Sequence, residues 1–118
     1  NEKIFIAGDY NIAPFDIDVY DPTSLESSLC FSYKEQQKLR RLFNMGFIDN
    51  YRVIHPTTPE FSWWDYRAGN FQQNKGMRID SIISSSNAVQ NLTNCMIDYE
   101  SRTKTKPSDH APVIGVYE

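Results

Sequence analysis

The sequence lacks a long hydrophobic run, and no apolar stretch approaches the roughly 18 residues that a membrane-spanning helix needs. It also lacks the pattern of a signal peptide, since Asn1, Glu2 and Lys3 lead directly into apolar residues. No internal repeat, low-complexity tract or Gly/Ser linker is present. These absences favour a globular protein that does not contact a membrane. The abrupt opening is what we expect of a strand cut from something larger.

Cysteine is scarce, because Cys30 and Cys95 are the only two in the chain. Their spacing matches neither a metal-binding nor a redox motif. We therefore expect two buried, reduced thiols and a cytoplasmic protein.

An excess of positive charge is also missing, since 12 basic residues face 15 acidic ones and the net charge is -3. This balance argues against a nucleic-acid binder, whose surface is usually basic. The basic residues nevertheless fall into three groups along the chain: Lys34, Lys38, Arg40 and Arg41; Arg67, Lys75 and Arg78; Arg102, Lys104 and Lys106. A locally positive face is therefore compatible with an acidic chain.

The 118 residues are enough for one small domain, and their patterning predicts a mixed α/β fold. Short apolar or alternating segments predict strands at residues 3–7, 61–66, 78–83, 92–99 and 112–117. Residues 9–32 read as a long polar loop, which is more often functional than not. The later strands follow one another through turns, and this order favours antiparallel pairing.

One helix is strongly indicated, over residues 33–45. Ser32 and Glu35 have the spacing of a capping box, which satisfies the free N–H groups of a first helical turn. Leu39, Leu42 and Phe43 then form an apolar stripe, and Gly46 provides a C-terminal stop.

Polar residues that can carry chemistry lie at the ends of the predicted strands, where a sheet can hold them still. Asp9 and Asn11 follow the first strand and could bracket a phosphate and its attacking water, or could simply form the turn. Asp80 lies in an apolar strand, which is costly for a carboxylate unless it is paired, for instance with Arg78.

Two further segments add to these. Asp109 and His110 precede the last strand and combine a hard-metal ligand with an imidazole that titrates near neutral pH, although such a pair can also be a cap. Trp63, Trp64 and Arg67 lie close together and suit either the core or a stacking platform for nucleobases or a sugar. We expect one tryptophan to be buried and the other exposed.

Each signal is weak alone, but their order along the chain is specific. Gly-Asp-x-Asn, Trp-Trp-Asp-Tyr-Arg, Arg-Ile-Asp and Ser-Asp-His-Ala-Pro follow one another from the first predicted strand to the last. This series closely resembles the C-terminal half of the exonuclease III family, within the endonuclease/exonuclease/phosphatase superfamily. The Asp-x-Asn and Ser-Asp-His elements are shared across that superfamily, whereas the tryptophan block points to its abasic-site and exonuclease branch.

The resemblance implies a fold and an activity. The fold would be an α/β sandwich with a mixed, mostly antiparallel sheet and a helix packed on one face. Residues 1–118 would form one half of a four-layer DNase I-like sandwich. The activity would be hydrolysis of duplex DNA in repair, as a 3′-to-5′ exodeoxyribonuclease, an abasic-site endonuclease and a 3′-end trimming enzyme. Its substrates would be double-stranded DNA with abasic sites or with blocked or recessed 3′ ends, in the cytoplasm at a bacterial nucleoid.

The resemblance also implies roles for individual residues. Asp80 would hold the imidazole of His110 in one tautomer and raise its basicity. His110 would orient or deprotonate the attacking water, or donate to the charge that develops on the phosphate. Asp9 would transfer a proton to or from the water or the leaving oxygen, and these two assignments stay open. Asn11 would donate a hydrogen bond to a non-bridging phosphate oxygen.

A metal ion and a substrate pocket are implied as well. Asp109, together with Asp9, would help to hold Mg²⁺ or Mn²⁺, directly or through water. Trp63, with Met77 beside it, would line a pocket that accepts an extrahelical abasic sugar or a frayed terminal nucleotide. Candidates for contacts with phosphates or the strand are Arg67, Asn74 and Arg78.

Members of the family are about twice as long as this chain. Their N-terminal half supplies a Glu metal ligand, an Asn near it and a Tyr, none of which can be placed here. We therefore expect the N-terminal half of the same enzyme as a partner and little activity from these residues alone. Without that half, an apolar sheet face would be exposed, and the chain would dimerise or aggregate.

Two other functions remain possible on the same residues. A phosphoesterase that acts on a lipid or inositol phosphate would share Asp9, Asn11, Asp109 and His110 but would have no clear use for the segment 63–67. A domain that kept the fold without catalysis would bind no metal. Titration with Mn²⁺ against an Asp109→Ala variant separates this last possibility from both enzymes.

Overall fold

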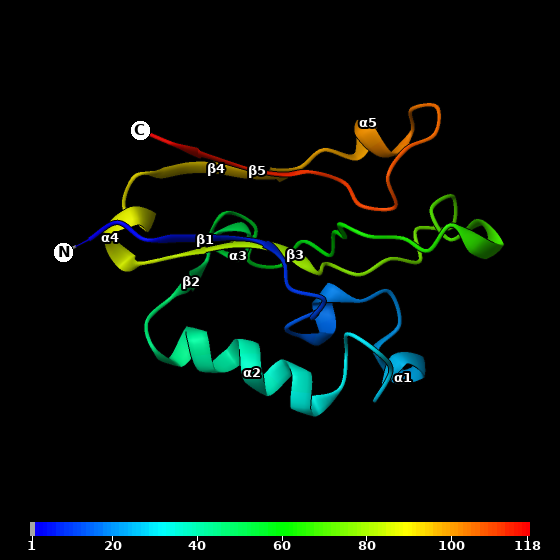
Figure 1. The fold of residues 1–118 in the computed structure, drawn as a ribbon, viewed down its shortest axis with the longest axis horizontal. Helices are drawn as coiled ribbons and strands as arrows, with labels where there is room; N and C mark the ends of the chain where they lie inside the picture. Colours follow the sequence, from blue (N-terminus) through cyan, green and yellow to red (C-terminus); the bar gives the residue numbers. More distant parts are fainter. Residues whose placement is uncertain (1) are drawn as a thin grey trace.

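The computed structural model describes residues 2–118 and contains two antiparallel sheets (Figure 1). The first has three strands in the order β1-β3-β2, and the second pairs β4 with β5. The strands are β1 (Phe5–Asp9), β2 (Ile48–Asp49), β3 (Asp80–Ser84), β4 (Leu92–Ile97) and β5 (Val113–Tyr117). The antiparallel α/β prediction is confirmed, although the strands form two hydrogen-bonded sheets where one was expected.

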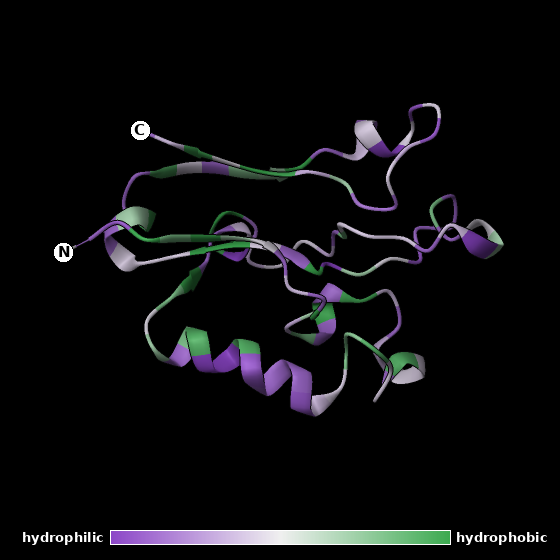
Figure 2. Ribbon diagram, in the orientation of Figure 1, coloured by the Kyte–Doolittle hydropathy of each residue, from purple (hydrophilic) through white to green (hydrophobic). Residues whose placement is uncertain are grey.

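The longest described helix is α2 (Tyr33–Asn44), which lies along one edge of the molecule (Figure 1). Its predicted capping box is present, because the Ser32 side chain accepts from the Glu35 N–H while Glu35 accepts from the Ser32 N–H. The helix ends at Asn44, and Gly46 follows with a φ of 104°, a conformation that glycine adopts without strain. Apolar and polar residues alternate around α2 as its stripe predicts (Figure 2).

The remaining helical elements are short. They are η1 (Asp16–Asp18), α1 (Pro22–Leu25), α3 (Asn50–Ile54), η2 (Arg67–Gly69), α4 (Ser86–Val89) and α5 (Tyr99–Arg102). Two of them, η1 and α1, lie within the segment 9–32 that was predicted to be a loop. None of the described helices is both long and apolar enough to cross a membrane.

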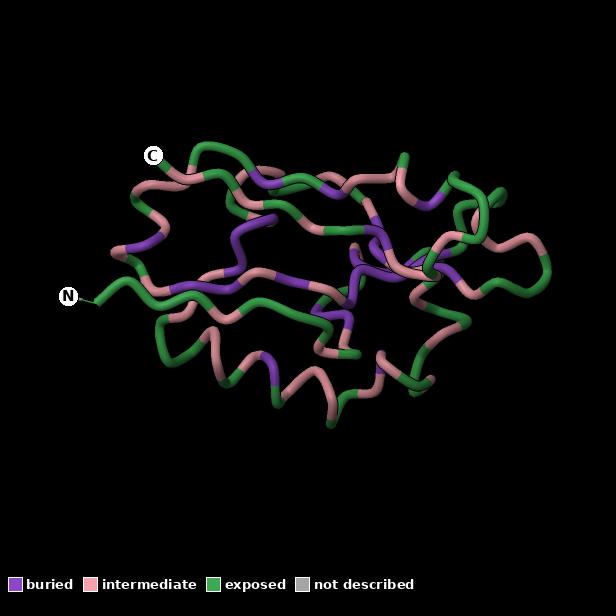
Figure 3. The backbone as a smooth tube through the Cα atoms, turned by 45° about the horizontal axis from the view of Figure 1, so that its top comes forward, coloured by how far each residue is buried: buried purple, intermediate pink, exposed green. Residues whose placement is uncertain are grey.

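Two apolar clusters form the core, and the buried parts of the chain run through the middle of the molecule (Figure 3). One cluster packs Tyr51 of α3 and Trp64 against Cys95 and Ile97 of β4. The other is built around the loop before α2 and the segment that leads into β3. Cys95 is buried as predicted, whereas Cys30 is only half-buried.

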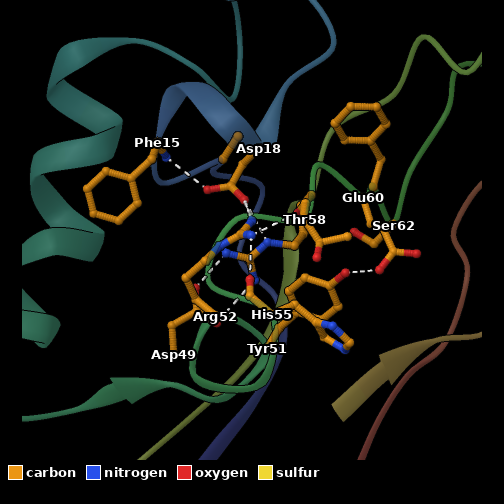
Figure 4. Close-up of polar contacts among 12 residues, drawn as sticks. Phe15, Asp18, Asp49, Tyr51, Arg52, His55, Thr58, Glu60 and Ser62 are labelled. Carbon is orange, nitrogen blue, oxygen red and sulfur yellow. Dashed lines mark hydrogen bonds and ion pairs between the residues drawn. The ribbon is translucent and has the colours of Figure 1, made fainter.

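A network of buried charges ties three distant segments together. Arg78 is fully buried and donates to Asp18 at 2.7 Å and to Asp49 at 2.5 Å, and Arg52 donates to Asp18 at 2.5 Å. Figure 4 shows Asp18 next to the guanidinium of Arg52, which lies 5.3 Å from the ring centre of Tyr51. Each charge of this network therefore has an opposite charge within hydrogen-bond distance.

Several predicted strand boundaries are wrong. Residues 61–66 form no strand, because Trp63 makes only isolated bridges to Met77 and to His110. The strand predicted at 78–83 begins at Asp80, since the Arg78 N–H donates to the Asp18 carbonyl instead of to a neighbouring strand. The first strand covers Phe5–Asp9, two residues later than predicted, so Asp9 belongs to the strand itself.

Candidate functional site

Three segments converge on the side chain of His110. Asp9 ends β1, Asp80 begins β3, and the register of this antiparallel pair places the two residues directly opposite each other. His110 comes from the loop before β5, and its Nδ1 lies 2.8 Å from Oδ2 of Asp80. Its Nε2 lies 3.6 Å from Oδ2 of Asp9. The structure thus brings together residues that lie far apart in the sequence.

Asp109 completes the cluster from the same loop as His110. Its Oδ1 lies 3.8 Å from Nε2 of His110, and its Oδ2 accepts a hydrogen bond of 3.1 Å from Nε1 of Trp63. The backbone of Asp109 is also fixed, because its carbonyl accepts from the N–H of Trp64 at 3.1 Å. Two partly exposed carboxylates, Asp9 and Asp109, therefore flank the imidazole nitrogen that Asp80 leaves free.

The surroundings shift the proton affinities of the central pair. Burial raises the pKa of Asp80, although the hydrogen bond with His110 works in the opposite direction. Burial alone would lower the pKa of His110, but the hydrogen bond with Asp80 and the charges of Asp80, Asp9 and Asp109 raise it above its ordinary value. A proton in this cluster is thus held by an imidazole that three carboxylates surround.

Asn11 lies beside the cluster in a constrained turn. Its φ is 53°, a left-handed conformation that asparagine tolerates better than most residues. Its backbone N–H donates to Oδ1 of Asp9 at 2.9 Å, and the preceding Tyr10 N–H donates to the carbonyl of Ile79 at 3.0 Å. The turn therefore orients the carboxylate of Asp9 and leaves Asn11 exposed next to it. The turn-forming and site-forming interpretations of this segment are both compatible with the geometry.

Ser62 supports the cluster and was not singled out from the sequence. Its buried hydroxyl oxygen accepts hydrogen bonds from the N–H groups of Ile79 at 3.0 Å and Asp80 at 3.1 Å. The Ser62 carbonyl also accepts from the N–H of Ala111, the residue after His110. One residue thus fixes the backbone on both sides of the Asp80–His110 pair. A lone serine in an apolar segment gives no sequence signal for such a role.

An open cavity of about 390 Å³ adjoins the cluster. It lies between the end of β1, the start of β3 and the residues that lead into β5, and its lining includes Asp9, Asp80, Ser108 and His110. The reactive side chains are therefore accessible from solvent on one side.

The donor set fits a divalent cation. Ligand atoms of Asp9, Asp80 and His110 all lie within 4.8 Å of one another. The carboxylates of this group supply oxygen, the ligand type that Mg²⁺ and Mn²⁺ prefer. Asp109 is not part of this group, but its Oδ1 lies 3.8 Å from Nε2 of His110.

The two tryptophans differ in burial. Trp64 is fully buried and donates through Nε1 to the side-chain oxygen of Asn74 at 3.1 Å. Trp63 is half-buried and touches the cluster through Asp109. The prediction of one buried and one exposed tryptophan is therefore right for Trp64, while Trp63 is only partly accessible.

The other predicted substrate-binding residues are not all at the surface. Met77 is buried in the core, where its backbone bridges to Trp63, so the expected role in lining the substrate pocket is wrong for this side chain. Arg78 is buried among Asp18 and Asp49, so the expected contact with a DNA strand is wrong for this side chain. Arg67 is exposed and donates to Asp65, whose pKa it lowers to about 2.

Comparisons with known proteins agree with this geometry. A model described as the Endonuclease/Exonuclease/phosphatase family matches residues 1–110. The chain is 37% identical over 120 residues to "Exodeoxyribonuclease III" of Haemophilus influenzae, a match that covers 96% of this chain and 45% of that protein. It is 32% identical to "Exodeoxyribonuclease" of Bacillus subtilis over 113 residues, covering 95% of this chain and 43% of that protein.

Solved structures give the same result. A 3′-5′ exonuclease from Neisseria meningitidis superposes with a TM-score of 0.96 at 38% identity, covering 98% of this chain and 45% of that one. An AP endonuclease from Archaeoglobus fulgidus superposes with a TM-score of 0.94 at 31% identity, covering 99% of this chain and 46% of that one. The chain thus spans less than half the length of the relatives that it matches. With its fold, its residue cluster and the family model in agreement, the chain belongs to the endonuclease/exonuclease/phosphatase family.

Proposed function

We propose that the chain is the C-terminal half of a DNA-repair phosphodiesterase that hydrolyses duplex DNA. Its activities would be 3′-to-5′ exonuclease, abasic-site endonuclease and 3′-end trimming. The observation that carries this proposal is the position of His110, which Asp80 holds between the carboxylates of Asp9 and Asp109 beside an open cavity. The named relatives are exodeoxyribonucleases and AP endonucleases, and one structural relative is bound to a product DNA hairpin.

His110 and Asp80 act as a unit in this proposal. The Nδ1–H donates to the Asp80 carboxylate, which fixes the tautomer and leaves Nε2 directed at the neighbouring acids. Neutral Nε2 can take a proton from the attacking water, and protonated Nε2 can donate to a phosphate oxygen as negative charge develops there. The raised pKa of His110 favours the second role near neutral pH.

Asp9 and Asn11 contact the phosphate from the side opposite His110. Asp9 is oriented by the N–H of Asn11 and remains partly exposed, so it can exchange a proton with the water or with the leaving oxygen. The Asn11 side chain donates a hydrogen bond to a non-bridging phosphate oxygen and keeps the phosphate next to Asp9 and His110. Asp9 and Asp109 would hold a divalent ion, Mg²⁺ or Mn²⁺, which would polarise the phosphate.

Substrate selection depends on the partly accessible Trp63, which stands beside Asp109. A pocket walled by this ring would accept an abasic sugar or a frayed end more readily than a paired nucleotide. Arg67 and Asn74 are exposed on the adjoining turn and contact the strand through its phosphates.

The partner of this chain is the N-terminal half of the same enzyme. Two residues of β5 expose large apolar side chains on one face of the strand, with exposed fractions of 41% for Ile114 and 38% for Val116. An opposing sheet would bury these side chains.

The test is metal-dependent cleavage of a duplex with a single abasic site by the full-length protein. We expect cleavage with Mg²⁺ or Mn²⁺, and a drop in kcat of about 10²- to 10⁴-fold for His110→Asn. Asp16→Asn is the matched control, because Asp16 is an exposed acid outside the cluster.

An active control and a silent His110→Asn protein would support the proposal. An intact abasic duplex under all of these conditions would refute it, and hydrolysis of an inositol phosphate in its place would identify the other branch of the family.

A further inference from the structure

A second cavity, of about 480 Å³, is lined by residues near η2 and α5 and lies apart from the His110 cluster. The helix α5 lies at one end of the molecule (Figure 1). The walls of the cavity come from the turn around η2 and from the loop that follows α5, and they include Tyr66, Phe71, Arg102 and Lys104. It shares no lining residue with the cavity beside His110.

Arg102 has an unusual environment within this cavity. Only 7% of the residue is exposed, and its guanidinium lies 5.0 Å from the ring centre of Tyr66 and 4.8 Å from that of Phe71. The guanidinium lies over both rings, but its N–H groups still need hydrogen-bond acceptors. Only one long bond is made, of 3.3 Å, to the carbonyl of Trp64, and the buried Nε has no partner.

The charge of Arg102 is also unbalanced. Across residues 2–118, no carboxylate forms an ion pair with Arg102 or with the neighbouring Lys104. The other deeply buried arginine, Arg78, has two carboxylates within hydrogen-bond distance. A buried cation without a counter-ion is costly, so an anion in the cavity would supply what the chain itself supplies for Arg78.

We propose that this cavity binds a backbone phosphate of the DNA substrate, at a point on the strand away from the scissile phosphate. A guanidinium and an ammonium together suit a phosphate, and Tyr66, which is 60% exposed, offers a ring for the adjoining sugar or base. Free inorganic phosphate would have no use for the aromatic walls. The DNA identity of the ligand rests on the proposed function.

The cavity is also linked to the catalytic loop. The Tyr66 hydroxyl donates to the carbonyl of Pro107 at 2.6 Å, and Asp109 and His110 follow only two and three residues later. A phosphate held here therefore fixes the strand relative to the reactive cluster without touching it. Contacts of this kind set the position of a strand and carry no sequence information.

The experiment measures binding of an undamaged duplex to the full-length protein by fluorescence anisotropy, with metal chelated so that no cleavage occurs. The salt concentration is varied between about 50 and about 200 mM, and the slope of log affinity against log salt counts the phosphates neutralised. We expect Lys104→Gln and Arg102→Met each to reduce the size of that slope, by at most about 0.9 because the two cations share one phosphate. Lys34→Gln is the control, because Lys34 is exposed on α2, outside this cavity.

Thermal unfolding of each variant identifies loss of fold, and exposed Lys104 keeps the test decisive if Arg102→Met is unstable. An unchanged slope for Lys104→Gln, or a protein that binds no duplex, overturns the inference. Displacement of the duplex by a low concentration of inorganic phosphate would also contradict it, since the rings of Tyr66 and Phe71 would then contribute nothing to binding. Failure of the proposed nuclease reaction is distinguishable, because the slopes are measured without metal and without cleavage.

Discussion

At the scale of single residues, the hydrogen bond between Asp80 and His110 helps to set the pKa of the imidazole. The imidazole carries a raised pKa because one carboxylate is hydrogen-bonded to it and two others lie near its free nitrogen. Burial works against this increase, so the carboxylates outweigh the loss of hydration. The protonated form therefore persists to a higher pH than in an isolated histidine.

Replacing Asp80 by asparagine tests this balance directly. The change removes the bonded carboxylate and its charge and leaves burial, which disfavours the imidazolium. We expect the pKa of His110 to fall below its value in the unchanged protein, as followed by NMR titration of the imidazole protons. Asp16→Asn should leave the pKa of His110 unchanged, because Asp16 lies outside the cluster. An imidazole that titrates at the same pH in the Asp80→Asn variant would show that Asp80 does not control the proton.

The sequence predicts the acids and the imidazole of this cluster because each stands in a short, recognisable motif at a strand end. It does not predict the environment of Arg78, whose acceptors Asp18 and Asp49 lie 60 and 29 residues away. Nothing local to Arg78 distinguishes a buried ion pair from an exposed phosphate ligand. Such partners become visible only when the segments that carry them are packed together.

At the scale of elements, the charge network of Arg78 joins the loop around η1, the end of β2 and the entry to β3. The Arg78 backbone adds to this by donating to the Asp18 carbonyl at 2.7 Å. Asp80 is only two residues further along, so the network sets where β3 begins and how Asp80 faces β1.

Arg78→Met removes the cation from this network and leaves two buried carboxylates without it. We expect a loss of about 3–5 kcal/mol in the free energy of unfolding, measured by urea denaturation of the full-length protein. Arg67→Met is the matched control, because Arg67 also pairs with a carboxylate but is exposed. Equal denaturation midpoints for the two variants would contradict a structural role for the network.

Local signals explain which elements could be predicted. The α2 helix has a capping box, an apolar stripe and a terminal glycine, and all three depend on neighbouring residues only. Residues 61–66 have the composition of a strand, but Trp63 faces Met77 on one side and His110 on the other through single bridges. Tertiary contacts there override the local preference for a strand.

At the scale of the whole molecule, the strands are unevenly covered. Cys95 and Ile97 of β4 are buried against α3 and the tryptophan segment, whereas Met96 and Ile114, partners across the same strand pair, are exposed at 37% and 41%. An alternation of this kind predicts a second layer on the uncovered side, and the matched relatives are more than twice as long as this chain.

The 118-residue chain by itself should therefore self-associate, and light scattering at increasing concentration should give a mass above that of the monomer. Ile114→Lys should reduce this association, because a charge in the uncovered face must then be desolvated on contact. Lys38→Gln on α2 is the control and should change nothing, since Lys38 lies on a different element. Adding the separately produced N-terminal half should convert the associated chain into a one-to-one complex, because that half would cover the same apolar side chains. A monomer at every concentration, with no binding to that half, would mean that these strands need no second layer.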